Sequence, residues 1–214
     1  MTFFEFIQTS YPDILKSVLE HIRLVTISVL VGIVVSIPLG ILLTRNKRLA
    51  SIVLALAGVV QTIPGLVMLG FVLILLGIGL IPALVVLSLY SILPILRNTY
   101  TGIIEVEPSL IEAARGIGMS GTQILFGVQL PLALPTIVSG IRISAVYIVS
   151  WATLAGLIGA GGLGDLIWTG LASYNTNYIL SGAIPSAVLA FLISGLVGLF
   201  QDLITPRGLR RKRA

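Results

Sequence analysis

The amino-acid sequence predicts an all-α membrane protein with five transmembrane helices. Of its 214 residues, 57% are hydrophobic and 10% are charged, and the mean hydropathy is +1.11. An ordinary soluble domain carries about 25% charged residues, and much of its surface must face water. The apolar residues also gather in five runs, and a bilayer-spanning helix needs about 20 of them. These observations exclude a soluble enzyme and a disordered chain.

The five predicted spans cover residues 24–43, 49–76, 81–96, 132–158 and 179–204. The second is long enough to tilt or to bend at Pro64-Gly65, and the fourth is interrupted only by Arg142. A charge at the centre of a bilayer costs about 2.5–3.5 kcal/mol. We therefore expect the Arg142 side chain to reach back to the cytoplasmic interface, with a polar contact in the interior as the alternative.

The basic residues predict the orientation of the spans. Most of them follow the first, third and fifth spans, whereas only Lys16 and Arg23 fall on the opposite side. Because basic residues favour the cytoplasmic side, the N-terminus is predicted outside and the C-terminus inside. Residues 1–23 are expected to form a surface helix on the outer face, 24–204 the transmembrane domain, and 205–214 a basic cytoplasmic tail.

Small residues recur at every fourth position of the first span, at Ser28, Gly32, Ser36, Gly40 and Thr44. This spacing places them on one helix face, where another helix can approach closely. The stripe fits ordinary packing within the chain, or contact with a partner subunit or with a pathway through the membrane.

The longest cytoplasmic segment, 101–131, is predicted to form two short helices joined by a glycine corner. Pro108 suits a first helical turn, and Gly116 and Gly118 can end the first helix in a left-handed conformation. The second helix is expected over 121–129 and should end before Pro131. Two pairs have capping-box spacing, namely Ser109 with Glu112 and Ser120 with Gln123.

The same segment contains Glu112-Ala113-Ala114, then Gly118, then Val128-Gln129-Leu130-Pro131. It follows the pattern E-A-A, three residues, G, nine residues, I-x-L-P, with Val128 in place of isoleucine. In this it resembles the membrane subunits of binding-protein-dependent ABC importers, and the resemblance extends from about residue 20 onward. It implies a type I importer (MetI-like) permease fold in the bacterial cytoplasmic membrane.

In that family, the loop docks on an ATP-binding subunit and converts ATP-driven closure into opening of the membrane pathway. By position, the resemblance assigns this ATPase-coupling role to Glu112, Ala113, Ala114, Arg115, Gly118 and Ser120. An ion pair between Glu112 and Arg115 within the helix is the alternative interpretation of these two charges.

The sequence contains no phosphate-binding loop, because none of its lysines follows a glycine. ATP and Mg²⁺ are therefore expected on a partner subunit, and this chain is predicted to bind no cofactor and not to be an enzyme. No acidic residue is central in a span, which disfavours a proton-coupled carrier. No metal-binding cluster occurs in the sequence either. The pattern G-x-G-x-x-G at 159–164 is interpreted as a tight turn, since no βαβ unit surrounds it.

Three stretches, 61–65, 140–144 and 150–164, resemble the osmoprotectant branch of the family, which imports glycine betaine, carnitine and choline. Aromatic faces attract quaternary ammonium groups by cation–π interaction. The candidate pathway or gate residues are Gln61, Tyr90, Tyr147, Trp151, Gly161 and Gly162, with ordinary packing as the alternative for the aromatic ones.

The resemblance implies several partners. They are two copies of an ATP-binding subunit, a second permease subunit, identical or homologous, and an extracellular or periplasmic substrate-binding protein. No nucleic-acid partner is expected. A permease for methionine or another amino acid is the alternative within the family, and a passive pore or membrane assembly protein is the alternative from another class.

Overall fold

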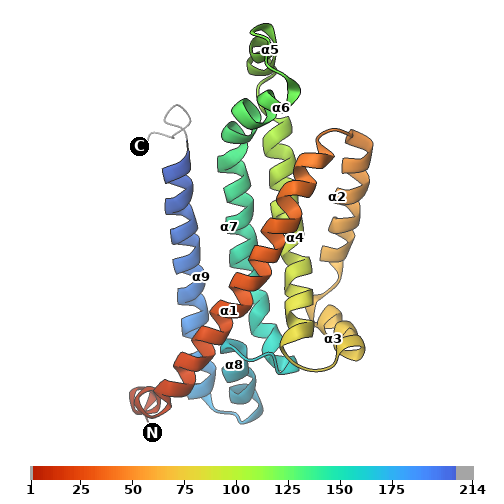
Figure 1. Ribbon diagram of the computed structural model, residues 1–214. Helices are drawn as coiled ribbons and strands as arrows, with labels where there is room; N and C mark the ends of the chain where they lie inside the picture. Colours follow the sequence, from red (N-terminus) through yellow and green to blue (C-terminus); the bar gives the residue numbers. More distant parts are fainter. Residues whose placement is uncertain (1, 206–214) are drawn as a thin grey trace.

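The computed structural model describes residues 2–205, and within these residues it contains helices only (Figure 1). The elements are α1 (Phe3–Leu43), α2 (Lys47–Thr62), α3 (Gly65–Leu76), α4 (Leu80–Ile104), α5 (Pro108–Gly116), α6 (Gly121–Ile124), a π-helical turn (Leu125–Gln129), α7 (Leu130–Ala155), a 3₁₀ turn (Gly156–Ile158), α8 (Leu163–Ala172) and α9 (Thr176–Ile204). The all-α prediction is confirmed. The basic residues of the predicted tail, from Arg207 onward, lie outside the described residues.

Four helical segments are long and apolar enough to cross a membrane: α1, α4, the continuous stretch 121–158, and α9. Helices α2 and α3 pass the same test as a pair and are bent by 93°. The bend lies at Ile63 and Pro64, as the sequence predicts, because proline cannot continue the hydrogen bonds of α2. The chain thus has four candidate spans, or five if the bent pair is one span.

Helix α1 differs from its prediction. Residues 3–23 are helical, but they continue into the first span without a break, giving one helix of 41 residues. This part of α1 is also not simply a surface segment, because Phe6, Ser17 and His21 are buried. Phe6 packs edge-on against Tyr178 of α9, with ring centroids 4.8 Å apart. Contacts with α8 and α9 therefore hold it as part of the fold.

The core lies where α4 packs between α1 and α7. The small-residue stripe of α1 faces α4: the Ser91 hydroxyl donates to the Ser28 carbonyl at 2.9 Å, and the Ser36 hydroxyl donates to the Ile92 carbonyl at 3.1 Å. Gly32 lies directly against Ser91. The stripe therefore serves helix packing within this chain.

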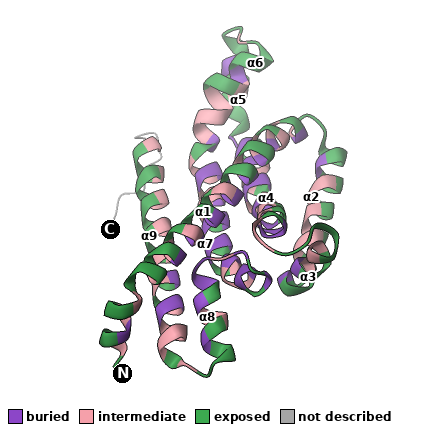
Figure 2. Cartoon of the chain, turned by 60° about the horizontal axis from the view of Figure 1, so that its bottom comes forward, coloured by how far each residue is buried: buried purple, intermediate pink, exposed green. Residues whose placement is uncertain are grey.

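The outer helices are exposed on long apolar faces. Figure 2 shows buried residues concentrated along α1, α4 and α7, whereas α2, α3 and α9 are largely exposed. Only 6% of the most apolar window of α9 is buried within the chain. Apolar surface of this extent suits contact with lipid or with another membrane subunit.

Candidate functional site

The first candidate site is the segment 101–131, called the coupling loop after its predicted role; its helix α5 projects beyond the bundle at the end opposite the N-terminus (Figure 1). Helix α5 begins with Pro108 as predicted, but its N-cap is Glu107 and no side chain caps it. The predicted capping box of Ser109 with Glu112 is therefore wrong. The Ser109 hydroxyl instead donates to the Glu107 carboxylate at 2.6 Å, because the helix begins earlier than the serine spacing suggested.

The glycine corner forms around Gly118, whose φ is +86°. Its amide donates to the Arg115 carbonyl at 2.9 Å, and the Met119 amide donates to the Ala114 carbonyl at 3.1 Å. These bonds close the end of α5 with a glycine in the left-handed region. Gly116 has no such role, because it is still a helical residue of α5.

The second helix begins as predicted and ends elsewhere. The Ser120–Gln123 capping box is present, with the Ser120 amide donating to the Gln123 side-chain oxygen at 2.7 Å. The helix does not stop before Pro131, because α6 continues through the π-helical turn into α7. The π-helical turn ends two residues before Pro131, and the helix continues past the proline ring.

The residues predicted to couple to an ATPase are mostly exposed. Glu112, Ala113 and Arg115 are exposed, whereas Ala114 is buried. Within the part of the chain that the structure describes, Glu112 and Arg115 form no ion pair. Both charges are thus free to meet a partner, while Ser120 is already engaged as a helix cap.

The second candidate site is a cavity of about 210 Å³ lined by Gln61, Tyr90, Tyr147 and Trp151. Four of the six predicted pathway residues therefore come together, from α2, α4 and α7. The rings of Tyr90 and Trp151 stack with centroids 4.8 Å apart and an angle of 20°. Tyr147 is 55% exposed. We call these four residues the aromatic pocket.

The bend between α2 and α3 is clamped by this pocket. The Gln61 amide nitrogen donates to the Tyr90 carbonyl at 3.1 Å, and the Tyr90 hydroxyl donates to the Ile63 carbonyl, at the corner itself. Gly65 lies against the Trp151 ring so closely that a Cβ atom there would overlap it. The bend and the pocket are thus one packing unit.

A larger, more open cavity of about 520 Å³ adjoins the aromatic pocket. It lies between α7 and α9 and shares Tyr147 with the pocket; its other lining residues are Ser139, Arg142, Ile143, Val146 and Ser194. The half-buried Arg142 donates from Nε to the Ser194 hydroxyl at 2.9 Å. The structure therefore contains a polar contact of the kind expected as the alternative to a side chain that reaches the cytoplasmic interface.

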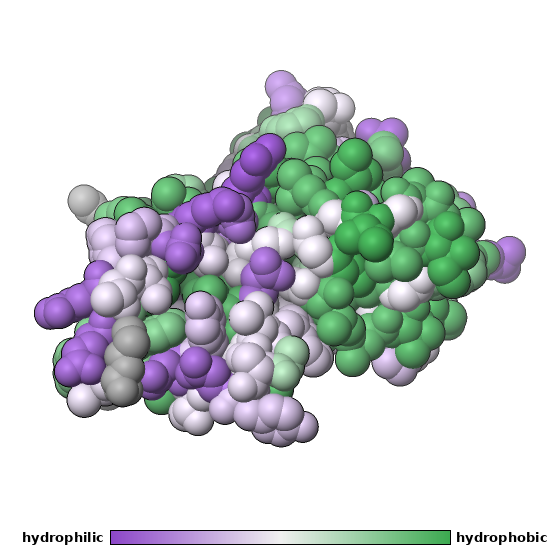
Figure 3. Space-filling view, turned by 90° about the horizontal axis from the view of Figure 1, so that it is seen from below, coloured by the Kyte–Doolittle hydropathy of each residue, from purple (hydrophilic) through white to green (hydrophobic). Residues whose placement is uncertain are grey.

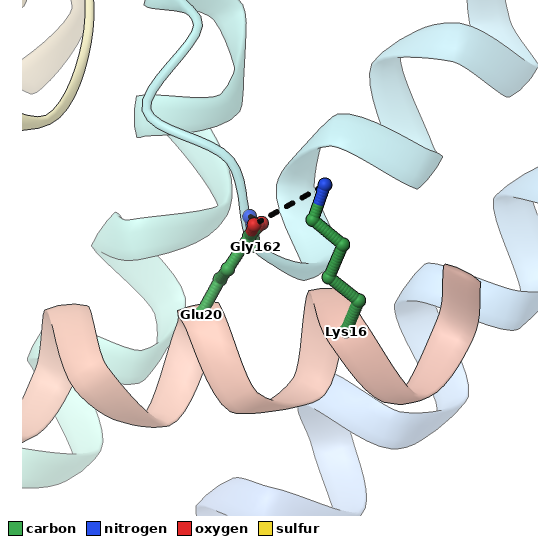
Figure 4. A network of polar contacts seen from close by, with 3 residues as sticks. All are labelled: Lys16, Glu20 and Gly162. Atoms are coloured by element: carbon green, nitrogen blue, oxygen red, sulfur yellow. Dashed lines mark hydrogen bonds and ion pairs between the residues drawn. The ribbon is translucent and has the colours of Figure 1, made fainter. Parts of the chain in front are cut away.

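The remaining two candidates, Gly161 and Gly162, do not join the pocket. They form the turn before α8 with φ of +78° and +83°, which supports the tight-turn interpretation. The Gly162 amide donates to the Glu20 carboxylate at 3.0 Å, and Lys16 pairs with Glu20 at 3.8 Å (Figure 4). No pattern in the sequence predicts this contact, because 142 residues separate its two sides.

The same end of the molecule is divided into a polar and an apolar half. Figure 3 shows hydrophilic side chains gathered over the N-terminal part of α1 and hydrophobic ones over α3. Near Glu20, partial burial and the negative charge of Glu20 raise the pKa of the Asp165 carboxyl in α8, while Lys16 opposes this shift. Charged groups are thus grouped where α1 meets α8.

Curated proteins with similar sequences show which kind of protein has this architecture. Three curated relatives are permeases: the glycine betaine/carnitine/choline transport system permease protein OpuCB of Bacillus subtilis, 46% identical (96% of this chain, 94% of that protein); the choline transport system permease protein OpuBB of the same organism, 45% identical (97% and 95%); and the carnitine transport permease protein OpuCB of Listeria monocytogenes, 42% identical (97% and 95%).

Solved structures give the same picture. The inward-facing MetNI methionine ABC transporter contains a chain of similar fold, with a TM-score of 0.82 and 27% identity over 92% of this chain and 99% of that one. A chain of an amino acid ABC transporter has a TM-score of 0.77 at 18% identity, over 94% and 98% of the two chains, and shows the fold alone. Residues 36–209 match one family, and this chain therefore belongs to the inner membrane components of binding-protein-dependent transport systems.

Proposed function

We propose that this chain is the permease subunit of an ABC importer for quaternary-amine osmoprotectants such as glycine betaine, carnitine and choline. The observation that carries the proposal is its identity of 42–46%, over nearly its whole length, to permeases named for these compounds. The aromatic pocket supports it, because aromatic faces suit a cation that has no N–H to donate.

The proposed topology has five spans in a bacterial plasma membrane, with the bent α2–α3 pair as the second span. The N-terminus lies outside and the C-terminus inside. Basic residues support this orientation: Arg45 lines a cavity with Gly121 and Thr122 of α6, and Lys47 and Arg48 begin α2 directly after it. The α5 end then faces the cytoplasm, and the turn before α8 faces the substrate-binding protein.

Energy is proposed to come from a separate ATPase, which binds ATP and Mg²⁺ and docks on α5. The projecting position of α5 and the exposed charges of Glu112 and Arg115 support this role. Two ATPase copies would meet two permease subunits, because five spans are few to enclose a pathway. The exposed apolar faces of α2, α3 and α9 offer surface for a second, identical or homologous permease.

A charge reversal at α5 tests the coupling. The complex is co-expressed and purified with its ATPase, and glycine betaine-stimulated ATP hydrolysis and uptake are measured for Glu112→Lys. We expect normal membrane insertion with loss of ATPase binding or of stimulation. Asp13→Lys, an identical charge change at an exposed site at the other end, is the matched control. Normal stimulation and uptake in Glu112→Lys would contradict the coupling role, and ATP-independent flux would indicate a passive pore.

A methionine permease is the second candidate, favoured by the fold shared with the MetNI transporter at 27% identity. The curated relatives argue for quaternary amines instead, because their identity to this chain is much higher. Uptake competition between the two substrate classes decides between these functions.

A further inference from the structure

We propose that Arg142 binds the carboxylate of a zwitterionic substrate as it passes through the membrane, with the ammonium end against Tyr147. The inference rests on the proposed function and deepens it. Such a site at Arg142 distinguishes substrates that carry a carboxylate, such as glycine betaine and carnitine, from choline, which carries a hydroxyl group instead.

The first observation is that the hydrogen-bonding capacity of Arg142 is mostly unused. Its Nε donates to the Ser194 hydroxyl. Among residues 2–205, neither Nη1 nor Nη2 has a hydrogen-bond acceptor, and no acidic side chain pairs with the guanidinium. Charged side chains within membrane spans are costly, and those retained usually act on a substrate or an ion.

The second observation is that a glycine of α9 leaves space for the guanidinium group of Arg142. It lies over Gly198 of α9, where a Cβ atom would come within 3.3 Å of Nη1. Ser194 and Gly198 are one helical turn apart, so one face of α9 supplies both a hydrogen-bond acceptor and a gap. This arrangement holds Nε at Ser194 and packs the guanidinium against Gly198, and Arg142 is one of the residues that line the cavity of about 520 Å³.

The third observation is the place of Tyr147, which lines both this cavity and the aromatic pocket. Arg142 and Tyr147 are five residues apart on α7, which corresponds to about 7.5 Å along a helix axis. Trp151 follows about 6 Å further along. A carboxylate-binding group and aromatic faces therefore succeed one another along a single helix.

The chemistry of the two ends matches a small zwitterion. The paired donors of a guanidinium fit the two oxygens of a carboxylate, with hydrogen bonds strengthened by charge. A quaternary ammonium interacts with an aromatic face by cation–π attraction, and the exposed ring of Tyr147 offers such a face. Choline would place its cation near an uncompensated guanidinium, so it gains nothing from Arg142.

A carboxylate could also come from a neighbouring protein chain rather than from the substrate. The two sources have different consequences. A protein carboxylate would make Arg142 important for assembly and for every substrate alike. A substrate carboxylate would make Arg142 important for glycine betaine and carnitine alone.

The test uses the complete importer in proteoliposomes, with ATP inside or outside as its orientation requires and the binding protein saturated. Initial uptake of glycine betaine, carnitine and choline is measured for wild type and for Arg142→Gln. We expect the ratio of glycine betaine to choline uptake to fall about tenfold or more, the size of effect expected for hydrogen bonds to a charged group. Arg142→Lys should recover part of the ratio, because it keeps the charge without the fork.

Two further variants complete the test. Arg97→Gln removes an exposed arginine in the C-terminal half of α4 that does not line this cavity, and it should leave the ratio unchanged. Tyr147→Ala should lower uptake of all three compounds. An equal loss for all substrates in Arg142→Gln, or an unchanged ratio, would overturn the inference. Transport of choline alone by wild type would also overturn it, whereas transport of none of the three would overturn the proposed function itself.

Discussion

The coupling loop and the aromatic pocket are built in opposite ways. In the loop, the hydrogen bonds that set its shape join residues two to five positions apart, such as Ser120 with Gln123 and Met119 with Ala114. In the pocket, the contacts join distant residues, such as Gln61 with Tyr90 and Tyr90 with Trp151. The predicted docking region is thus shaped by local contacts, whereas the region that lines a cavity depends on the packing of the whole bundle.

The largest expected effect comes from a substitution that disturbs the packing of the aromatic pocket. Gly65→Ala places a Cβ atom within the Trp151 ring, so that either the ring or the α2–α3 bend must move. Overpacking of this kind costs about 1–3 kcal/mol. We expect a lower thermal unfolding temperature of the purified complex and reduced uptake. Gly70→Ala is the matched control on α3, because a Cβ atom there meets no atom within 4 Å.

A second substitution sharpens this comparison. Trp151→Leu removes the ring, and in combination with Gly65→Ala it should restore part of the lost thermal stability. Equal unfolding temperatures for Gly65→Ala and Gly70→Ala would show that the ring does not hold the bend.

The next effect concerns the corner of the coupling loop. Gly118 has a left-handed backbone, and a side chain there costs about 1–2 kcal/mol. Gly116, two residues earlier, is helical and equally open to solvent. We expect Gly118→Ala to lower the substrate transported per ATP hydrolysed several-fold, because α5 leaves its position, while Gly116→Ala leaves this ratio unchanged. Equal ratios of substrate transported to ATP hydrolysed in the two variants would show that coupling does not depend on the Gly118 corner.

The smallest effect distinguishes the two serines of the loop. Ser120→Ala removes a formed cap and should cost about 1 kcal/mol, whereas Ser109→Ala removes none and should cost a few tenths. Hydrogen exchange of the backbone amides measures both. The Gln123 amide should exchange several-fold faster in Ser120→Ala. Faster exchange of the Glu112 amide in Ser109→Ala would instead show that the predicted capping box of Ser109 with Glu112 does form.

The same contrast explains how far the sequence could predict the structure. The bend at Pro64, the cap at Ser120 and the corner at Gly118 depend on nearby residues, and all three are confirmed. Errors arose at helix ends, where one residue decides the boundary: the cap of α5 is Glu107, and α6 continues past the expected end before Pro131.

Contacts between distant residues were beyond sequence reasoning. Gln61, Tyr90, Tyr147 and Trp151 could be selected for their chemistry, but nothing in their spacing placed them around one cavity. Ser194, 52 positions from Arg142, carried no signal as its partner. Glu20 likewise carried no signal as the acceptor for the Gly162 amide, because only helix packing brings α1 to the turn before α8.

The central claim is that this chain forms part of an ATP-driven pathway for quaternary amines. Its most direct test is uptake of radiolabelled glycine betaine by the reconstituted importer, with excess unlabelled choline, carnitine or methionine as competitors. We predict ATP-dependent uptake that choline and carnitine reduce and methionine does not. Uptake of label that only methionine reduces, or a complex that transports methionine and no quaternary amine, would contradict the claim.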